Sequence, residues 1–407
     1  MNIYEKALAL HARNKGKLSV ESKVEIDSEE DLSLAYSPGV AEPCRKIADD
    51  SKKIFDYTSR GNMIAVVSSG TAVLGLGNIG AGASLPVMEG KAVLFKKFAG
   101  LDAFPICLDT EDPDRIVETV KLLSPVFSGV NLEDIAAPDC FYIEKRLKKE
   151  TEMAIFHDDQ HGTAIVILAG LYNATKVTSK DLTACKIVIN GAGASATATA
   201  NLLIQKGIER ENLIICDSRG IIHSCREDGM NEAKEKLAAK TNPKNIAGSL
   251  NKAVKNADIF IGLSVGGVLD RAMIDKMADD PIIFALANPE PEIDPSVAKK
   301  AGASVVATGR SDHPNQINNV LAFPGVMRGA ISVRSSEINQ EMKLSAARNL
   351  AELVKSPSPD KIIPPPLRRG VTGEVALAVA RTAMEEGCAG EARDDRELRE
   401  KFSRQTY

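Results

Sequence analysis

The sequence predicts an α/β protein whose second half folds as a doubly wound parallel sheet. Short segments that are apolar throughout alternate there with helical segments. Strands that are apolar on both faces are typical of parallel sheets that helices cover on two sides. The chain also has 407 residues, more than one hydrophobic core normally supports. We therefore expect a second α/β domain in the N-terminal half.

The composition is that of a soluble globular protein, with 44% hydrophobic and 26% charged residues. A net charge of -4 gives no reason to expect nucleic acid or an anionic membrane as partner. The seven cysteines are scattered without a C-x-x-C pair, which indicates reduced thiols. No apolar run approaches the roughly 20 residues of a membrane span, and the N-terminus lacks a secretory core. We expect a cytoplasmic protein.

The first half begins with a charged, helical pattern over residues 1–60, interrupted by SPGVAEP. Residues 63–74, MIAVVSSGTAVL, contain two β-rich runs joined by Ser-Ser-Gly, which predicts a hairpin. AVLFKKF and FPICLDT are further predicted strands. Apolar residues at helical spacing predict surface helices over 115–123 and 140–149.

The second half contains the predicted strands KIVING, LIICD, ADIFIGLS, IIFALANP and SVVATG, with a helix from about residue 194 after the first. The tail from about residue 335 is helical, and KSPSPDKIIPPPLRRG interrupts it as a surface connection. We expect an N-terminal domain over 1–160 and a second domain over 161–335. A C-terminal helical segment over 336–407 is expected to pack back on the N-terminal domain.

KIVINGAGASATATANLLIQKG combines a strand, a Gly-x-Gly-x-x-Ala turn and a helix. Gly191 permits the tight turn, and Gly193 lets a pyrophosphate approach the backbone. Ala194 and Ser195 begin the helix, whose N-terminus supplies N–H donors and positive potential. Ala196 keeps that helix close to the sheet. This pattern predicts a dinucleotide site in a Rossmann-type domain.

Asp217 ends the next predicted strand, LIICD, where a carboxylate can accept hydrogen bonds from a ribose hydroxyl pair. This acid favours NAD, because the 2′-phosphate of NADP would meet its negative charge. Arg219 follows two positions later and keeps NADP possible. It is equally well explained as an exposed turn residue before Gly220.

Two adjacent acid pairs stand out: Glu133-Asp134 in NLEDI and Asp158-Asp159 in FHDDQHGTA. Either pair alone is typical of a solvated turn. Together they flank the apolar segment MAIF and can converge at the carboxyl end of that strand. Such a group of carboxylates suits Mg²⁺ or Mn²⁺. The two histidines beside the second pair lack a third zinc ligand, so we do not expect zinc.

Eight motifs in order resemble those of malic enzymes of the short, prokaryotic type: AYSPGVAEPC, LGLGNIG, PVMEGKAVLFKKF, NLEDI, FHDDQHGTA, NGAGASA, ALANPEPE and GRSDHPNQINNVLAFPG. The resemblance runs in register from about residue 30 to residue 380. It implies that the protein oxidises L-malate with NAD or NADP and decarboxylates the product to pyruvate and CO₂, using a divalent metal.

The resemblance also implies catalytic roles. Lys91, in MEGK, corresponds to the general base, whose pKa burial or a nearby cation must lower. Asp158 corresponds to the acid that assists this lysine. Tyr36, in AYSPG, corresponds to the acid that protonates the enol carbon. The remaining acids, Glu133, Asp134 and Asp159, correspond to the metal ligands.

Binding roles follow in the same way. Asn288, in ANP, and Asn318, in QINN, correspond to amides that hold the substrate carboxylate and the nicotinamide, with Asn319 beside them. One position departs from the larger relatives, which have an arginine before LGLG that clamps a substrate carboxylate. Ala72 stands there in this chain, and what replaces the arginine is open.

Two other functions are consistent with parts of the pattern. A 2-hydroxy-acid dehydrogenase that does not decarboxylate would use the dinucleotide site but needs no acidic cluster. A catalytically silent dinucleotide-binding module would lack Tyr36, Lys91 or one of the acids, and all are present. We expect malate and pyruvate as small-molecule partners, no nucleic acid or membrane partner, and a homodimer.

Overall fold

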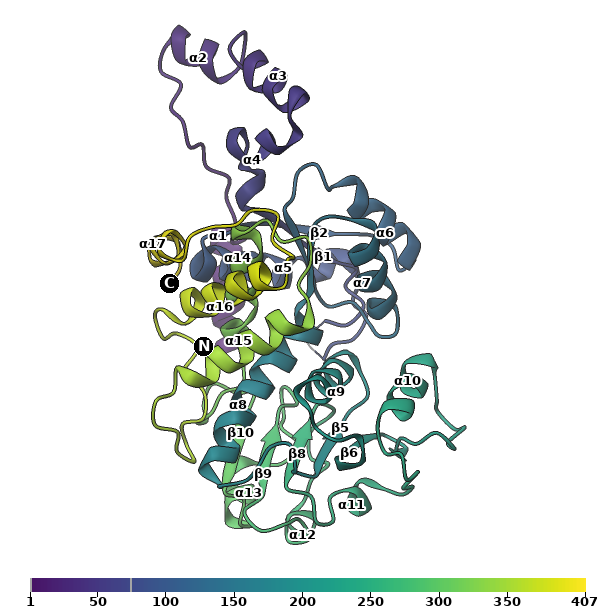
Figure 1. Ribbon diagram of the computed structural model, residues 1–407. Coiled ribbons are helices and arrows are strands. Elements are labelled where there is room, and N and C mark those ends of the chain that lie inside the picture. The colour runs from purple at the N-terminus through teal and green to yellow at the C-terminus, as the bar shows by residue number, and fades with distance from the viewer. Residues whose placement is uncertain (1, 74) are drawn as a thin grey trace.

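The computed structural model describes residues 2–73 and 75–407, which form two sheets connected by helices (Figure 1). The first sheet is parallel and has the order β2-β1-β3-β4. The second has the order β10-β9-β8-β5-β6-β7 and is parallel except for β7. The strands are β1 (Met63–Ser68), β2 (Asp102–Cys107), β3 (Gly129–Leu132), β4 (Ala154–His157), β5 (Ile187–Asn190), β6 (Leu213–Asp217), β7 (Gly220–Ile221), β8 (Ile259–Gly262), β9 (Ile282–Ala285) and β10 (Val305–Thr308). The predicted α/β fold is confirmed.

Helices surround both sheets. The α-helices are α1 (Ile3–Asn14), α2 (Glu29–Ala35), α3 (Ala41–Asp49), α4 (Ile54–Tyr57), α5 (Gly80–Ala99), α6 (Pro113–Leu122), α7 (Asp139–Glu150), α8 (Thr163–Val177), α9 (Ala194–Lys206), α10 (Glu232–Lys240), α11 (Leu250–Ala253), α12 (Arg271–Ile274), α13 (Pro295–Lys300), α14 (Phe323–Ser332), α15 (Gln340–Glu352), α16 (Val371–Glu385) and α17 (Asp395–Gln405). Other helical turns are η1 (Ser51–Lys53), η2 (Ser59–Asn62), η3 (Asp158–Gly162), η4 (Arg210–Asn212) and η5 (Asn319–Leu321).

Two predictions for the first half are wrong. The expected hairpin over 63–74 is a single strand, β1, which pairs in parallel with β2 and β3. The chain leaves the sheet at Gly70 and folds against the start of α5, where a Cβ on Gly70 would lie 2.3 Å from the Gly80 carbonyl oxygen. Leu74, the end of the expected second run, lies outside the described residues. The segment AVLFKKF is helical because its buried residues, Ala92, Phe95 and Phe98, follow a helical spacing.

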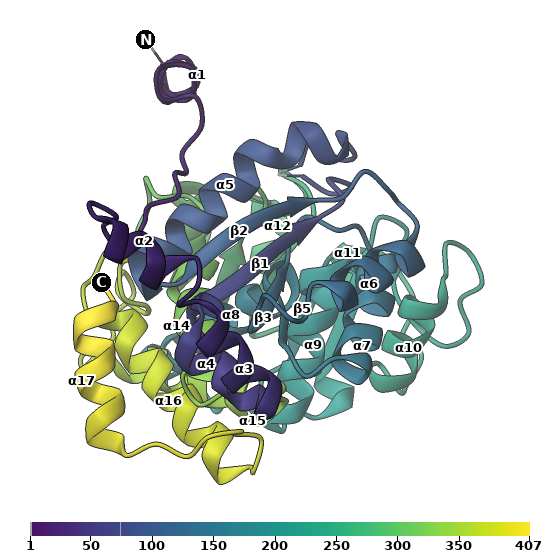
Figure 2. The same cartoon turned by 90° about the horizontal axis from the view of Figure 1, so that it is seen from above.

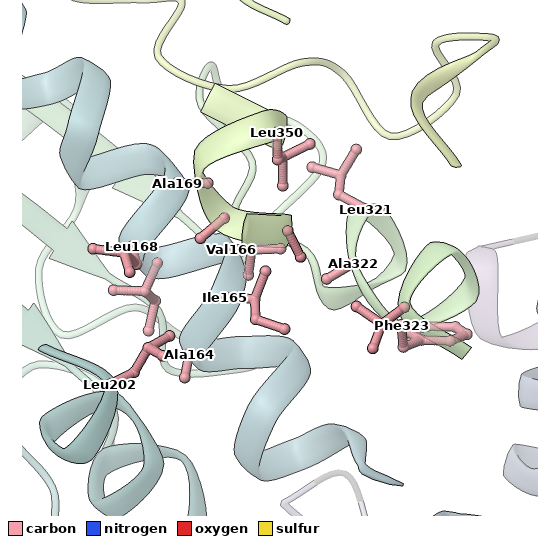
Figure 3. Packing of buried hydrophobic residues seen from close by; sticks show 14 of the residues in the cluster. Ala164, Ile165, Val166, Leu168, Ala169, Leu202, Leu321, Ala322, Phe323 and Leu350 are labelled. Carbon is pink, nitrogen blue, oxygen red and sulfur yellow. The ribbon is translucent and has the colours of Figure 1, made fainter. Parts of the chain in front are cut away.

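One hydrophobic core extends across both sheets. Helix α8, which connects the sheets, contributes Ile165, Val166 and Leu168 to this core, and all are at most 1% exposed. Figure 3 shows these side chains between Leu202 of α9 and Leu350 of α15. Buried apolar surface contributes about 25 cal/mol per Å² to stability, so this shared core stabilises the packing of the two sheets against the helices between them.

The C-terminal helices cover the side of the core that faces α5 and α8. Figure 2 shows α16 and α17 next to each other, and α16 also packs on α14 and α15. The contact between α14 and α16 is close because Gly325 and Gly329 face α16. A Cβ on Gly329 would lie 2.4 Å from the Ala376 carbonyl oxygen. Helix α14 in turn packs against α5.

Helices α2, α3 and α4 form an arm that projects from the body (Figure 1). None of them contains a buried residue. The exposed apolar side chains of the arm and of the linker before it include Val24, Leu34 and Tyr36, which are 61%, 68% and 71% exposed. Within the described residues, no helix is both long and apolar enough to cross a membrane.

Candidate active site

Acidic side chains meet at the carboxyl edge of the first sheet. Glu133 and Asp134 follow β3, and Asp159 follows the neighbouring strand β4 in η3. Each of the three offers one carboxylate oxygen, and these oxygens lie within 4.8 Å of one another. The backbone amide of Asp134 donates to Asp159 Oδ2 at 2.9 Å. Asp134 has a left-handed φ of 52°, which aspartate tolerates better than most residues and which is common at functional sites.

The chemistry of these groups fits a hard divalent cation. Glu133 and Asp134 are about 95% buried, and a buried group of several carboxylates is stabilised by additional positive charge. Burial, followed by repulsion from Asp159, raises the pKa of Glu133 to about 7, although Lys91 opposes the shift. Burial also raises the pKa of Asp159. Three oxygen donors with room for water or substrate suit Mg²⁺ or Mn²⁺.

Lys91 lies beside this acidic group. It comes from α5 and is 7% exposed. Its Nζ is 2.7 Å from Glu133 Oε1 and 2.5 Å from Asp158 Oδ2. The same nitrogen lies 4.2 Å from the centre of the Phe323 ring, at the start of α14. Two carboxylates and an aromatic face therefore fix the position of the amine.

The charge state of Lys91 differs from the sequence-based expectation of a lowered pKa. Burial does act to lower the pKa of this lysine, but Asp158, Glu133 and Asp159 together raise it above the ordinary value. The pKa of Lys91 is raised because the carboxylates around this buried amine stabilise its charged form more than burial destabilises it. A divalent cation bound by Glu133 and Asp159 would offset the negative charge that produces the shift.

Asp158 and its neighbour face different partners. Asp158 is fully buried and accepts hydrogen bonds from Lys91 Nζ and, at 2.7 Å, from Asn319 Nδ2. Burial raises its pKa to about 7, against the opposing effect of Lys91. The π-helical turn η3 permits this arrangement because Gly162 has no side chain: a Cβ there would lie 1.7 Å from Asp158 Oδ1. Such turns are frequent at functional sites.

A buried polar cluster connects η3 to helices α7 and α15. His161 Nε2 lies 2.6 Å from Glu144 Oε1 of α7, and its Nδ1 lies 3.1 Å from Lys343 Nζ of α15. Burial, more than any partner, lowers the pKa of His161 to about 3 and that of Lys343 to about 7. The cluster joins three elements around the turn that carries Asp158 and Asp159.

The dinucleotide motif has the predicted strand-turn-helix form over β5 and α9. Gly191 has a φ of +135°, and a Cβ there would lie 2.3 Å from the Leu263 carbonyl oxygen. Nothing lies within 4 Å of the Cβ position of Gly193, so the backbone is open to a ligand. Ala196 is fully buried against the sheet. Ala194 and Ser195 form the first turn of α9, whose amides lack intrahelical acceptors.

Asp217 ends β6 and lies in a basic environment that the sequence motif did not indicate. Arg226 Nη2 and Lys234 Nζ lie 2.5 and 2.7 Å from Asp217 Oδ2. Burial opposes the shift, but these two cations hold the pKa of Asp217 well below its usual value. Arg219, the cation considered from the sequence, instead pairs with the exposed Asp228.

The three asparagines have different surroundings. Asn319 contacts Asp158 directly, as described above, whereas the Asn318 side chain caps η5 by accepting from the Val320 amide. Asn288 follows β9, and a Cβ on Gly309 would lie 2.8 Å from its Nδ2. Ala72 donates its backbone amide to the Asp134 carbonyl oxygen at 3.0 Å. The loop that carries Ala72 is therefore connected to the acidic group.

Tyr36 lies outside this group in the described chain. It follows α2, a helix of the projecting arm (Figure 1), and its exposed fraction is 71%. The sequence analysis also missed Phe323, Arg226 and Lys234. Arg226 and Lys234 lie in no motif, and the motif LAFPG that contains Phe323 gives no sign that its ring contacts Lys91, because these contacts depend on tertiary packing.

Comparison with known proteins gives a consistent result. Residues 14–148 match the family model "Malic enzyme, N-terminal domain", and residues 160–384 match "Malic enzyme, NAD binding domain". A "Bifunctional malic/malolactic enzyme" from Bacillus subtilis is 57% identical, over 100% of this chain and 99% of the relative. An "NAD-dependent malic enzyme" from Geobacillus stearothermophilus is 49% identical, over 96% of this chain and 80% of the relative. The crystal structure of malic enzyme from Pyrococcus horikoshii has a TM-score of 0.96 at 47% identity, covering 99% of this chain and 96% of the other.

Proposed function

The chain belongs to the malic enzyme family, and on this premise we propose that it oxidises L-malate and decarboxylates the product to pyruvate and CO₂. The observation that carries the proposal is the contact of the buried Lys91 with Glu133, a member of the three-carboxylate group. A hydroxy-acid dehydrogenase that only transfers hydride has no need of this group. A catalytically silent dinucleotide-binding module would need neither the buried lysine nor the three-carboxylate group.

The chain's own residues supply a proton path and a binding site. Lys91 takes the proton of the malate hydroxyl as hydride passes to the nicotinamide. Asp158, to which Asn319 donates, holds the lysine in place. We assign Glu133, Asp134 and Asp159 to a Mg²⁺ or Mn²⁺ ion. When bound, such an ion polarises the substrate oxygen and stabilises the negative charge that develops on it as CO₂ leaves.

Other residues position the two substrates. Asn288 and Asn318 carry amides that can both donate to a carboxylate and accept from a carboxamide, and we assign them to malate and the nicotinamide. The turn of Gly191 and Gly193 and the N-terminus of α9 would receive the pyrophosphate. We further infer that the protein acts in the cytoplasm, with small molecules as its substrates.

The products test the proposal and separate it from a second activity. The relative from Bacillus subtilis is described as a bifunctional malic and malolactic enzyme, so lactate is the alternative product of malate in this chain. We expect pyruvate as the main product of malate with NAD and Mn²⁺, identified by NMR. Lactate as the main product, with no net reduction of NAD, would favour the malolactic reaction instead. Oxaloacetate accumulating without CO₂ would contradict decarboxylation.

We propose that NAD is preferred, because the Asp217 carboxylate can accept from the ribose hydroxyls. Asp217→Ser should raise the dissociation constant of NAD about 10–100-fold, which is the usual effect of losing a hydrogen bond to a charged group. It should strengthen NADP binding, because Arg226 and Lys234 would face the 2′-phosphate without Asp217 between them. Dissociation constants for both dinucleotides provide the measurement.

Asp228→Ser is the matched control, since it removes a nearby exposed acid that pairs with Arg219. It should leave both constants nearly unchanged. A wild-type preference for NADP would mean that Arg226 and Lys234 outweigh Asp217.

We propose that the protein is a homodimer in which the arm of one copy packs on the other. The arm has no buried residue in α2, α3 or α4 but carries several exposed apolar side chains. Contiguous exposed apolar surface is typical of protein interfaces. This arrangement would bring Tyr36, which lies away from Lys91 in its own chain, to the site of the second copy as the acid.

Mixing two inactive variants tests this role of Tyr36. Tyr36→Phe and Lys91→Ala should each lower malate turnover by about 10²–10⁴-fold, the usual loss of a positioned acid or base. If each site combines Tyr36 of one copy with Lys91 of the other, every mixed dimer regains one intact site. Random exchange of equal amounts would then restore roughly a quarter of wild-type activity. No recovery in dimers shown to be mixed would place both residues in the same chain's site.

A further inference from the structure

A polar cavity lies at the base of the arm, away from the acidic group. Its volume is about 310 Å³, and η2, α14 and the segment around α17 line it. The cavity is thus formed where the arm, the core helix α14 and the C-terminal region meet. Its size is at the lower end of the range for small-molecule sites.

The lining of this cavity is strongly basic. Five of the lining residues are cationic and none is acidic: Lys23, Arg328, Arg334, Arg393 and Lys401. Glu391 lies nearby and pairs with Arg334 and Arg393, each at 2.9 Å. Arg393 also pairs with Glu397, and Arg334 lies 3.7 Å from Asp56. Among the described residues no ion pair is found for the remaining three cations.

Arg328 is the strongest indication that the cavity is built for a ligand. It is a guanidinium on α14 that is 1% exposed. Its Nη1 donates to Asn62 Oδ1 at 2.8 Å and to the Ala99 carbonyl oxygen at 3.4 Å, both of which are neutral acceptors. Its Nε has no hydrogen-bond partner among the described residues. Asp102 is close enough to favour the charged form of Arg328, but among the described residues it forms no ion pair with it. A bound anion would reduce the remaining cost of burying this cation.

Two further lining groups have polar atoms in the same condition. The hydroxyl of Ser332, 2% exposed, and the Nε of Arg393 are hidden from solvent without a partner in the described parts of the chain. Buried polar atoms are nearly always hydrogen-bonded. All three atoms belong to residues that line this one cavity, so its lining carries more hydrogen-bond donors than the described residues satisfy.

The ionisation of the lining agrees with an excess of positive charge. Burial, and after it repulsion from Arg328 and Arg393, lowers the pKa of Lys401 to about 8. Burial lowers the pKa of Arg328 to about 10. In both cases burial is the larger cause, and the acids nearby, Asp102 for Arg328 and Glu397 and Glu391 for Lys401, offset it only in part.

We propose that this cavity binds a small polyanion, a phosphate ester or a compound with several carboxylates, through Arg328, Arg393 and Lys401. Arginine matches both groups because its planar donors can bind two oxygens at once. The volume accommodates a metabolite larger than inorganic phosphate and smaller than a dinucleotide. The ligand chemistry is that of an oxyanion with at least two charges.

The cavity is connected to the acidic group through two helices. Helix α14 begins at Phe323, whose ring contacts Lys91, and reaches the cavity at Arg328 and Ser332. Arg328 also donates to the last residue of α5, the helix that carries Lys91. A ligand that holds Arg328 therefore acts on both helices around Lys91, so we expect it to alter malate turnover.

Binding is tested with two probes on the full-length protein without metal or dinucleotide. Calorimetric titrations use inorganic phosphate and tricarballylate, at constant ionic strength set with chloride. Phosphate represents the phosphate-ester source and tricarballylate the carboxylate source. We expect at least one probe to bind wild-type protein in the millimolar range or tighter. Absence of binding by both would overturn the proposal.

The variants place the bound probe. Arg328→Ala is avoided because it removes a buried side chain and can prevent folding. Arg393→Gln and Lys401→Gln should weaken binding at least about tenfold, the loss expected for a charge-assisted contact. Arg396→Gln is the matched control, since it makes the same change on α17 at a side chain that is 87% exposed. Equal affinity in all four proteins would place the probe elsewhere and contradict the proposal.

The same set of proteins tests the effect on catalysis. With malate, NAD and Mn²⁺ present, titration of the bound probe should change the kcat or KM of wild type and of Arg396→Gln. The change should be absent in Arg393→Gln. Identical responses in all proteins would show competition at the malate site, and no response in wild type would contradict the coupling through α14. The calorimetric result does not depend on turnover, so failure of the proposed function would not affect it.

Discussion

Replacing Lys91 with alanine is expected to lower malate turnover by about 10²–10⁴-fold, the usual loss when a positioned base is removed. The amine is held between Glu133 and Asp158 at 2.7 and 2.5 Å, and no other lysine or arginine within the described chain pairs with either acid. Reduction of a supplied 2-keto acid should fall equally, because the same proton moves in reverse. Stopped-flow absorbance of the dinucleotide measures both directions.

Lys96→Ala provides the matched control for this experiment. Lys96 lies on the same helix, but its side chain is 65% exposed and pairs with Asp102. An exposed ion pair contributes at most about 1 kcal/mol, so turnover should stay near the wild-type value. Circular dichroism should show that both variants are folded. More than a tenth of wild-type turnover in folded Lys91→Ala would remove this lysine from the role of base.

Asparagine in place of Asp159 is expected to abolish metal binding and turnover together, whereas asparagine in place of Asp158 should mainly lower turnover. Asp159 belongs to the three-carboxylate group, and Asp158 contacts Lys91 and Asn319 instead. Loss of a residue that only supports a ligand costs about 10–100-fold in metal affinity, so loss of a ligand should cost more. Mn²⁺ affinity by electron paramagnetic resonance and kcat at saturating Mn²⁺ separate the two effects.

The two variants control for each other, because they make the same change at adjacent positions of η3. Asp158→Asn should bind Mn²⁺ within about tenfold of wild type and lose about 10²–10⁴-fold in kcat. Equal loss of Mn²⁺ affinity in both variants would mean that the two aspartates act as one ligand pair. The assigned division of roles would then be wrong.

The parts of the fold that could be predicted were those with a local signal. The five parallel strands of the second sheet are apolar runs between helical segments, and each was found in place, whereas the short antiparallel strand β7 was not predicted. The acidic pairs were recognisable because parallel strands end at a common edge, which brings Glu133 and Asp159 together from residues 26 positions apart. Gly191 was recognisable because a positive φ at a close approach admits only glycine.

The parts that could not be predicted depend on tertiary contacts. AVLFKKF has β-rich composition, but its burial against the sheet and α14 follows a helical period. Lys91 itself carries no local sign of its two carboxylate partners, which lie far along the chain. Arg226 and Lys234 reach Asp217 only because the segment after β7 folds back to it. Tyr36 is the converse case. Its sequence motif predicted a catalytic residue, but within its own chain the side chain is exposed and lies away from Lys91.

The central claim is that one site oxidises and decarboxylates malate with the help of a cation held by Glu133, Asp134 and Asp159. The most direct test supplies malate labelled at the carboxyl group next to the methylene carbon, and counts labelled CO₂ and NADH in the same reaction. With Mn²⁺ present, we predict equal amounts of the two, and with EDTA in excess, neither. NADH formed without CO₂, or undiminished formation of both in EDTA, would contradict the account.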